Sequence, residues 1–520
     1  MKALSWLFLF SITCRADAAV TTFTNPVLAG DYPDPSVIRV GTDYWATATS
    51  SEWGPQFPLL RSSDLVNWEI TGSVFATRPA WAAGNFWAPE ISEWRGRYYI
   101  YYVARRKGGP LSVACASADK PGGPYTDHGP FISQSAGSID PVPVTDEKGE
   151  RWLVWKEDGN SRRLPTILWT QRLDDDGTHV VGQPREILRN DQPWEGAVVE
   201  GPFLLRRGDY FYLFYAGNGC CGRNCAYAVG VARSKTLLGP WKKHAANPIL
   251  AENAAWKCPG HGSVVIDERG RYWLLYHAYD PRSFVYTGRE ILVDEIKFDQ
   301  DGWPAINGGN GPGATASSPF ATVQRHSEFK FLDDFTGPAL RPGWQWPQEN
   351  QPVTRSDHGQ LVLAPASGQG SNPIGAVLAR CTTSGDYQAE TIIDLASLKP
   401  GAIAGLSAFG DPANAMGLAV VRDGLLVWQQ QKNKFQTNVF EKSLNGKVAH
   451  LRMNVAGGNR FQFSISPDGK AWRAVGQSTE GGYLPPWDRS VRVALTVGGV
   501  AGAEGKFDLL RITSSAGAAP

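Results

Sequence analysis

The sequence lacks an excess of charge of either sign. Its 520 residues include 51 Lys and Arg against 50 Asp and Glu, which gives a formal net charge of +1. A protein that binds nucleic acid or an anionic membrane surface through its charge needs a strong positive balance. The composition therefore favours neither nucleic acid nor a membrane as a partner.

Apolar runs long enough to span a bilayer are also missing. One short apolar run, residues 4–12, follows the positive charge of Lys2, and it is too short to cross a membrane. Ala16-Asp17-Ala18 then fits a small-x-small cleavage site, so residues 1–19 are predicted to form a secretory signal peptide. We therefore expect the mature protein to be secreted or periplasmic.

The cysteines lack the paired CxxC spacing of zinc sites. Cys14 falls within the predicted signal peptide, and four of the remaining six cysteines lie close together: Cys220, Cys221, Cys225 and Cys258. Secretion favours disulfides over a metal site or free buried thiols, which remain the alternatives. We expect at least one bridge in this cluster, with Cys258 as a candidate partner and the pairing left open.

Aromatic residues and glycine, in contrast, are abundant, with 20 Trp and 57 Gly. Many aromatic residues combined with many Gly and Pro turns are typical of all-β proteins. Exposed Trp and Tyr rings also suit sugar binding, although most such rings fill cores. The chain is too long for one typical core, so we expect two domains.

One short pattern recurs five times along the first 304 residues: a turn with Gly followed by an aromatic-rich strand. The anchoring aromatic residues of the five copies are Tyr44, Tyr98, Trp152, Tyr210 and Tyr272. The copies are about 54 to 62 residues apart, the length of a four-stranded blade with its loops. The repeat predicts a five-bladed β-propeller over residues 22–304.

The rest of the chain shows no helical periodicity of useful length. Residues 305–324 are rich in Gly, Ala, Ser and Asn, a composition typical of a linker. Residues 325–515 contain alternating strands and a hairpin turn, which predicts a β-sandwich. The predicted fold class is all-β, a five-bladed β-propeller followed by a β-sandwich.

One position recurs in every copy, about ten to twelve residues before the anchoring aromatic residue. In four of the five copies it holds an ionisable residue: Asp34, Asp140, Glu200 and His261. Because the innermost strand of each blade should run there, we expect these side chains to meet at the channel mouth. Buried carboxylates are costly unless they are paired or functional, which indicates acid–base chemistry or a metal site. The alternative is that they are turn residues, since Asp-Pro is an ordinary turn start.

Five ordered motifs around these positions resemble family 43 of the glycoside hydrolases. They are Tyr32-Pro-Asp34-Pro-Ser, Phe86-Trp87-Ala-Pro-Glu90, Ser138-Ile139-Asp140-Pro, Glu200-Gly-Pro-Phe203 and Gly260-His261-Gly-Ser263. The resemblance implies inversion, with Asp34 as general base, Glu200 as general acid, and Asp140 orienting the acid and tuning its pKa. An inverting site keeps its two carboxyl groups about 6.5 to 9.5 Å apart, which leaves room for a water.

The same resemblance implies further site residues. Phe86, Trp87, Ile139 and His261 would contact the sugar, and Arg289 would lie in the active site, although Trp87 could instead be core, Arg289 a surface ion pair and His261 only a structural hydrogen-bonding residue. No cofactor is required, and a structural calcium ion at His261 is allowed, although no acidic calcium loop accompanies it. Glu195 is the main alternative for the acid, and Glu90 is a further carboxylate near the channel.

The function that the resemblance implies is cleavage of glycosidic bonds in plant polysaccharides or oligosaccharides. Our first hypothesis is an exo-acting α-L-arabinofuranosidase, with a β-xylosidase or an exo-β-galactanase as alternatives. A hypothesis from another class is a non-catalytic carbohydrate-binding propeller, which has no need of the three carboxylates. The tail resembles the concanavalin-like sandwich that often follows this propeller, and that lends a rim loop to the active site or binds polysaccharide.

Overall fold

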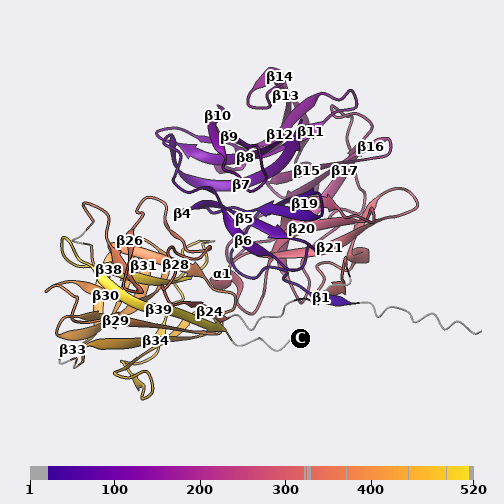
Figure 1. Ribbon diagram of the computed structural model, residues 1–520. Helices are drawn as coiled ribbons and strands as arrows, with labels where there is room; N and C mark the ends of the chain where they lie inside the picture. The colour runs from indigo at the N-terminus through magenta and orange to yellow at the C-terminus, as the bar shows by residue number, and fades with distance from the viewer. Residues whose placement is uncertain are drawn as a thin grey trace, which may run out of the picture.

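The computed structural model describes residues 21–320, 324, 330–369, 372–442, 444, 446–487 and 489–514. The predicted signal peptide lies outside the described residues. Nearly all regular structure is β, and it forms a propeller and a second β-domain beside it (Figure 1). The predicted fold class is thereby confirmed. In the described ranges, no helix is long and apolar enough to cross a membrane.

The propeller consists of five antiparallel four-stranded sheets, each formed by strands that are consecutive in the blade. The blades are β2 (Ser36–Val40), β3 (Asp43–Thr47), β5 (Gln56–Ser62) and β6 (Glu69–Phe75); β7 (Ala82–Trp94), β8 (Arg97–Arg106), β9 (Leu111–Ala118) and β10 (Thr126–Ile132); β11 (Ser138–Thr145), β12 (Arg151–Glu157), β13 (Ile167–Leu173) and β14 (Val180–Arg189); β15 (Val199–Arg207), β16 (Tyr210–Gly217), β17 (Ala228–Ser234) and β18 (Lys242–Lys243); and β19 (Lys257–Ile266), β20 (Tyr272–Tyr279), β21 (Glu290–Phe298) and β22 (Pro304–Ile306). The first strands contact one another in a closed ring, β2, β7, β11, β15, β19 and back to β2.

The repeated Gly turn joins the first and second strands of every blade. Its glycines all adopt positive φ, a conformation that residues with a Cβ rarely adopt: Gly41, Gly96, Gly149, Gly208 and Gly270. The anchoring aromatic residue then opens or follows closely on the start of the second strand, as Tyr210 opens β16. The sequence repeat therefore corresponds to the blades, one copy to each.

A second repeated feature bends the first strands where they line the channel. At the corresponding point of every blade a residue has positive φ, and in the first four blades proline follows it: Asp34 (φ 54°), Ala88 (44°), Asp140 (56°), Gly201 (53°) and His261 (37°). Because proline has no N–H to give to the ladder, the pairing of β7, β11 and β15 shifts register at this point. The resulting bulges aim side chains at the channel mouth.

This bulge corrects the predicted alignment of the fourth blade. The equivalent of Asp34 and Asp140 is Gly201, so Glu200 lies one residue earlier, level with Trp87 and Ile139. Counting back from the aromatic residues misplaced Glu200 because the distance from the bulge to the anchor differs among blades.

Much of the segment predicted to be a linker, residues 305–324, belongs to the propeller. β22 completes the last blade, η3 (Asn307–Gly309) follows it, and β23 (Thr315–Ser317) pairs with β1 (Thr22–Thr24). The Asn25 amide donates to the carbonyl oxygens of Val293 and Gly313 at 3.2 and 2.9 Å. The small polar residues here form turns that tie the two ends of the propeller together, which corrects the linker prediction.

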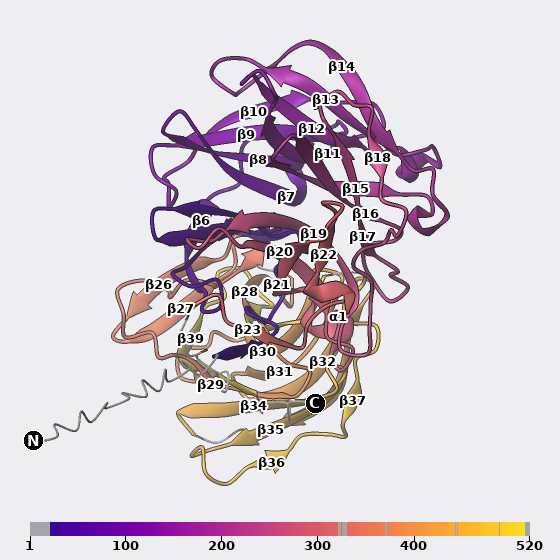
Figure 2. The ribbon, with the colours of Figure 1, turned by 90° about the vertical axis from the view of Figure 1, so that its right-hand side faces the viewer.

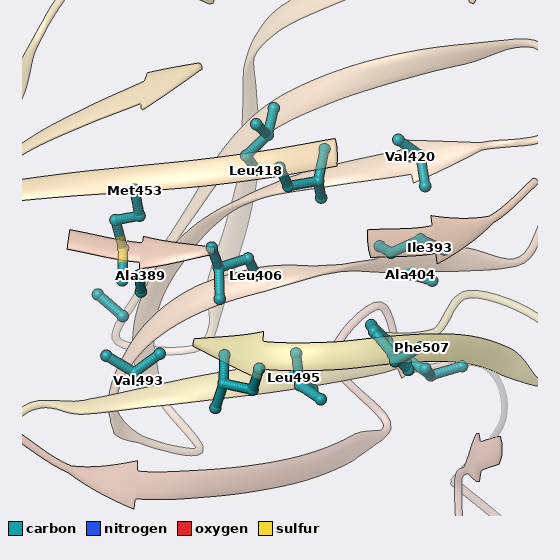
Figure 3. Close-up of a cluster of buried hydrophobic side chains, with 14 of the residues drawn as sticks. Ala389, Ile393, Ala404, Leu406, Leu418, Val420, Met453, Val493, Leu495 and Phe507 are labelled. Carbon is teal, nitrogen blue, oxygen red and sulfur yellow. The ribbon is translucent and has the colours of Figure 1, made fainter. Parts of the chain in front are cut away.

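The second domain is a sandwich of two antiparallel sheets. One contains β24 (Lys330–Asp333), β26 (Val353–Asp357), β27 (Gln360–Ala364), β29 (Tyr387–Asp394), β34 (Val448–Ala456), β35 (Arg460–Ser466), β36 (Arg473–Ala474), β37 (Thr479–Glu480) and β39 (Gly505–Ser514); the other contains β28 (Ala376–Cys381), β30 (Ile403–Asp411), β31 (Asn414–Val421), β32 (Gly424–Gln431), β33 (Lys434–Lys442) and β38 (Arg492–Gly498). Burial alternates along β29, as expected of a strand with one face in the core. Side chains from both sheets meet in the apolar core drawn in Figure 3.

The two domains share an interface with both apolar and polar contacts, and they lie against each other in both views (Figures 1 and 2). β25 (Trp346–Pro347) of the second domain pairs with β4 (Trp53–Gly54) of the propeller. Buried Arg492 forms an ion pair with Asp31 at 3.1 Å and stacks on the Trp53 ring. These contacts fix the second domain beside the channel mouth.

Candidate active site

Both carboxylate oxygens of Asp34 have partners, a hydroxyl at one and a guanidinium at the other. Thr49 donates its hydroxyl to Oδ2 at 2.7 Å, and the Arg289 guanidinium lies 3.1 Å from Oδ1. Nδ1 of His261 and Nδ1 of His277 lie 3.5 and 3.4 Å from the same Oδ1. Burial alone would raise the pKa of Asp34, but Arg289 above all, together with His261 and the Thr49 hydroxyl, lowers it to about 2. Asp34 is therefore ionised near neutral pH, as a general base must be.

Arg289 is part of this site and not a surface ion pair. Its side chain is buried, and its backbone N–H donates to Oδ1 of Asp31 at 3.3 Å. Because Asp31 also pairs with Arg492 of the sandwich, a continuous set of contacts runs from the second domain to Asp34.

Glu200 is bound at each carboxylate oxygen by a different residue. The Tyr227 hydroxyl donates to Oε1 at 2.8 Å, and Nζ of Lys156 lies 2.6 Å from Oε2. The Lys156 side chain is 1% exposed and also contacts Asp158 at 3.1 Å. Burial would lower the pKa of Lys156, but Glu200, Asp158 and Asp140 raise it overall. The charged lysine orients the Glu200 carboxyl group.

Asp140 is connected to Glu200 through the backbone of the bulge. Its Oδ2 accepts the N–H of Gly201 at 2.8 Å. Burial raises the pKa of Asp140 to about 6; the neighbouring Glu200 carboxylate adds to this, whereas His261 and Lys156 oppose it. A Cβ on Gly201 would lie 2.8 Å from Cγ of His261, so only glycine fits between these residues. Glu200 and the Asp140 side chain are thus brought to one point of the channel.

Two buried residues connect Asp34 with Glu200. The Asp34 N–H donates to Nδ1 of His277 at 3.0 Å, and the imidazole stacks on the Tyr227 ring with centroids 5.8 Å apart. Tyr227 in turn binds Glu200. Burial and the charge of Arg289 lower the pKa of His277 well below its usual value, so this imidazole is neutral. The two carboxylates therefore share one rigid support.

Sequence reasoning missed Lys156, Tyr227 and His277. Lys156 and His277 lie near the ends of the second strands β12 and β20, and Tyr227 directly precedes β17. Their strands are buried almost throughout, so the pattern indicates only core. A lysine in an otherwise apolar buried run was the one available signal, because an unpaired buried charge is costly.

The structure places Trp87 and Ile139 at the mouth but moves Phe86 away from it. Half-buried Trp87 packs against Ile139, Val103 and Leu111 beside the carboxylates. Phe86, in contrast, is 0% exposed and packs edge-on to Phe57 in the core between the first two blades. The expected sugar contact of Phe86 was wrong, because neighbouring residues of a strand point to opposite faces.

A tryptophan of the sandwich faces Trp87. The ring centroids of Trp487 and Trp87 are 6.3 Å apart, and Trp487 is 55% exposed. Arg223, in the propeller loop beside Trp487, donates to the carbonyl oxygens of Gly482 and Leu484 of the sandwich at 3.0 and 3.5 Å. The second domain therefore contributes one wall of the channel mouth.

Two disulfides fix the propeller loop that carries Arg223. Cys225 is bonded to Cys258 with a Cα separation of 6.0 Å, and Cys220 is bonded to its neighbour Cys221. The expected bridge within this cluster is thus present, whereas the bond between adjacent cysteines was not foreseen. Cys115 and Cys381 are free.

Glu195, the main alternative to Glu200, is a structural residue. It is completely buried in η2 (Pro193–Glu195), where Lys243 and Tyr215 bind Oε1 at 2.6 and 2.7 Å. Its Oε2 accepts the N–H groups of residues 191 and 192. With every acceptor position occupied, Glu195 has no oxygen left for a substrate.

Glu90 also differs from the site carboxylates. Burial raises its pKa to about 8, so it is neutral at pH 7, and Ser36 and Arg151 oppose this shift only in part.

As for a metal, the described residues contain no group of three or more His, Cys, Asp or Glu side chains arranged to bind one. Calcium at His261 stays a prediction, and no step below depends on it.

Comparison with known proteins identifies the family of each domain. A model of glycosyl hydrolases family 43 matches residues 23–304, and one described as the β-xylosidase C-terminal concanavalin A-like domain matches residues 332–488. Xylosidase/arabinosidase 43B of Humicola insolens is 30% identical over 76% of this chain and 76% of its own length. An extracellular exo-α-(1→5)-L-arabinofuranosidase of Cellvibrio japonicus is 27% identical over 58% of this chain and 92% of its own.

Solved structures share the two-domain fold. The crystal structure of a xylan β-1,4-xylosidase from Bacillus halodurans matches with a TM-score of 0.79 at 23% identity, covering 94% of this chain and 100% of that one. At this identity the match shows the fold alone. It extends over the propeller and the sandwich together.

Proposed function

The chain belongs to family 43 of the glycosyl hydrolases and is a glycosidase, and from that premise we propose that it releases terminal α-L-arabinofuranose from plant polysaccharides or oligosaccharides by an exo-acting, inverting mechanism. The observation that carries the proposal is the pair Asp34 and Glu200. They stand on blades that are not adjacent in the ring, and the buried side chains of His277 and Tyr227 connect them.

The proposed reaction is a single displacement. Asp34, ionised by its surroundings, takes a proton from a water that attacks the anomeric carbon, while Glu200 donates a proton to the departing glycosidic oxygen. The attack comes from the face opposite the leaving group, so the configuration at the anomeric carbon inverts. Lys156 stabilises the carboxylate that Glu200 becomes after it has donated its proton.

Exo action is proposed from the wall that the second domain contributes. Trp487 stands opposite Trp87, and the loop held by the Cys225–Cys258 bridge joins the wall to the propeller. A mouth narrowed on this side suits the end of a sugar chain better than its middle. The aromatic faces of the two tryptophans suit the apolar face of a terminal sugar.

Release of β-D-xylose is the second candidate, and one specific observation favours it. The sandwich matches a model described as the β-xylosidase C-terminal concanavalin A-like domain, and the Humicola relative is named for both activities. Arabinofuranose and xylose are both pentoses, and the same acid and base would serve either reaction.

Assays of nitrophenyl α-L-arabinofuranoside and nitrophenyl β-D-xyloside side by side test the proposal. We expect turnover of the arabinofuranoside to exceed that of the xyloside, and loss of both in an Asp34→Asn variant. The reverse preference would establish the second candidate. Absence of cleavage of either by a folded protein would contradict the proposed function.

We also infer that residues 1–19 direct export of the protein. The basis is the charged, apolar and small-residue order of this segment. N-terminal sequencing of protein recovered outside the cytoplasm should begin near residue 20, and a mature chain that retains Met1 would contradict the inference.

A further inference from the structure

We propose that a cavity beside Glu200 is a leaving-group subsite for a negatively charged sugar, a uronic acid, bound by Arg105 and Arg162. The inference deepens the proposed function, on which it rests, because it names the class of substrate that the same site accepts. It predicts that the terminal sugar is removed from an acidic glycan.

The cavity has a volume of about 480 Å³ and lies between the second and third blades. Its walls come from the end of β8, the start of β9 and the short helix η1 (Gly159–Arg162). The residues that carry the argument are Arg105, Leu111, Asp158 and Arg162. A volume of this size accommodates a monosaccharide unit.

Two contacts place this cavity next to the catalytic carboxylates. Asp158 on its wall binds Nζ of Lys156 at 3.1 Å, and the same Nζ binds Glu200 at 2.6 Å. Leu111 on its wall packs in one cluster with Trp87 and Ile139. The cavity and the channel mouth therefore share walls.

The chemistry of the reaction assigns the cavity to the leaving group. A general acid protonates the oxygen that departs, so the rest of the glycan must lie on the side of the acid. Glu200 is that acid in the proposed mechanism, and Lys156 and Asp158 continue from it towards the cavity. The sugar next to the cleaved bond is the unit that would reach Arg105 and Arg162.

The charge of the cavity points to an anion. Arg105 donates Nε to the neutral Asn85 amide oxygen at 3.0 Å, and Arg162 donates to the carbonyl oxygen of Ser135. Within the part of the chain that the structure describes, neither guanidinium forms an ion pair, and the one acidic residue of the lining, Asp158, is paired with Lys156. Both arginines are exposed, so their remaining N–H groups face solvent.

Neighbouring residues strengthen this preference. The exposed residues Arg106, Lys107 and Arg163 follow these two arginines directly in the sequence and add three positive charges in the same loops, although the whole chain carries a net charge of only +1. Leu164, 54% exposed, places an apolar side chain next to these cations. Arginine binds carboxylates through two parallel hydrogen bonds, and an apolar side chain covers a sugar face, so a uronic acid matches both features.

Kinetics with three substrates that release the same terminal sugar test the inference. The substrates are an oligosaccharide with a uronic acid next to the terminal sugar, its neutral counterpart and the nitrophenyl glycoside. We expect Arg162→Gln and Arg105→Gln each to raise KM for the acidic oligosaccharide about ten-fold, with KM for the neutral one unchanged. Arg185→Gln, on the outer strand β14, is the matched control and should change none of the three. An unchanged KM for the acidic oligosaccharide in the double variant would overturn the inference.

A binding experiment separates failure of the inference from failure of the proposed function. Calorimetry with the Glu200→Gln variant and the acidic oligosaccharide should show binding that weakens with salt and is lost in the double arginine variant. Absence of nitrophenyl glycoside cleavage by the wild type, with this binding intact, would contradict the proposed function only. Equal affinity for the acidic and the neutral oligosaccharide would contradict the charged subsite.

Discussion

The sandwich core and the propeller channel mouth are both buried, but they are built from opposite kinds of side chain. In the sandwich, Leu406, Met453 and Phe507 are 0% exposed and contact apolar groups (Figure 3). At the mouth, equally buried positions hold Lys156 and His277, with Asp34, Asp140 and Arg289 close to that burial. Burying charge is unfavourable unless each group is paired, so a stable scaffold has no need of the second arrangement.

The difference separates a region that serves the reaction, the channel mouth, from a region that serves stability, the sandwich core. Every carboxylate at the mouth has a cation or an N–H group within hydrogen-bond distance, which keeps the cluster in place. Substitutions at the mouth should therefore lower turnover in a folded protein. Substitutions in the sandwich core should lower stability and leave the turnover of folded molecules intact.

Asp34→Asn should give the largest effect of these substitutions. Loss of the general base removes the group that activates water, so kcat should fall by about 10³ to 10⁴ on both natural and nitrophenyl substrates. The measurement is steady-state kinetics with circular dichroism as the check of folding. Asp43→Asn, at a partly exposed ion pair of the same blade, is the control and should retain activity.

Glu200→Gln should depend on the substrate. Cleavage of natural glycosides should fall by about 10² to 10⁴, whereas substrates with a good leaving group need little protonation and should lose far less. The ratio of the two losses is the quantity to measure. Equal losses on both substrate types would contradict the assignment of Glu200 as the acid.

Phe507→Ala tests the other side of the comparison. Removing this completely buried ring should lower the free energy of unfolding by about 3 to 5 kcal/mol. Urea unfolding measures that loss, and kcat per folded molecule at low temperature should stay within about two-fold of the wild type. A large loss of kcat at full folding would show that the sandwich core takes part in the reaction.

The pH dependence of stability tests the charge cluster around Asp34. Its pKa falls from about 3.9 in an unfolded chain to about 2 in the protein, so it contributes stability above pH 4 that is lost as the pH falls towards 2. The contribution is about 2 to 3 kcal/mol at pH 6, and roughly half of it remains at pH 3. The stability difference between the wild type and Asp34→Asn should shrink over this range. A difference that is constant or grows on acidification would contradict the stabilisation of the ionised form.

Lys156→Met should have the smallest effect. The Glu200 carboxylate would lose one of its two partners but keep the Tyr227 hydroxyl, so kcat should fall by about ten-fold with KM unchanged. Lys235→Met, on an exposed site of the fourth blade, is the matched control. A rise in KM at constant kcat would place Lys156 in sugar binding instead.

Sequence reasoning predicted the blades well because the Gly turn and its aromatic residue have a local cause. A glycine with positive φ, such as Gly208, is needed wherever the first strand turns into the second, and the pattern therefore recurs with each blade. The linker prediction for residues 305–324 was less accurate because small polar residues suit ordered turns as well as flexible chain.

Sequence reasoning found the candidate site residues that lie on or next to the first, innermost strand of a blade. The bulge motifs containing Asp34, Asp140 and Glu200 are short and contiguous, so they can be found in the sequence. The predicted alignment nevertheless placed Glu200 one residue away from its structural position, because Gly201 is the residue equivalent to Asp34 and Asp140. Lys156 and His277 act through contacts between blades, and Trp487 reaches the mouth from another domain. No pattern within one strand encodes contacts of that kind.

The configuration of the sugar at the moment of release tests the central claim most directly. Proton NMR of the first-formed product distinguishes its two anomers before they equilibrate in water. With Asp34 as a base acting on water and Glu200 as the acid, the product should carry the configuration opposite to that of the substrate. A product with retained configuration would contradict the account, because it requires a carboxylate that attacks the sugar itself.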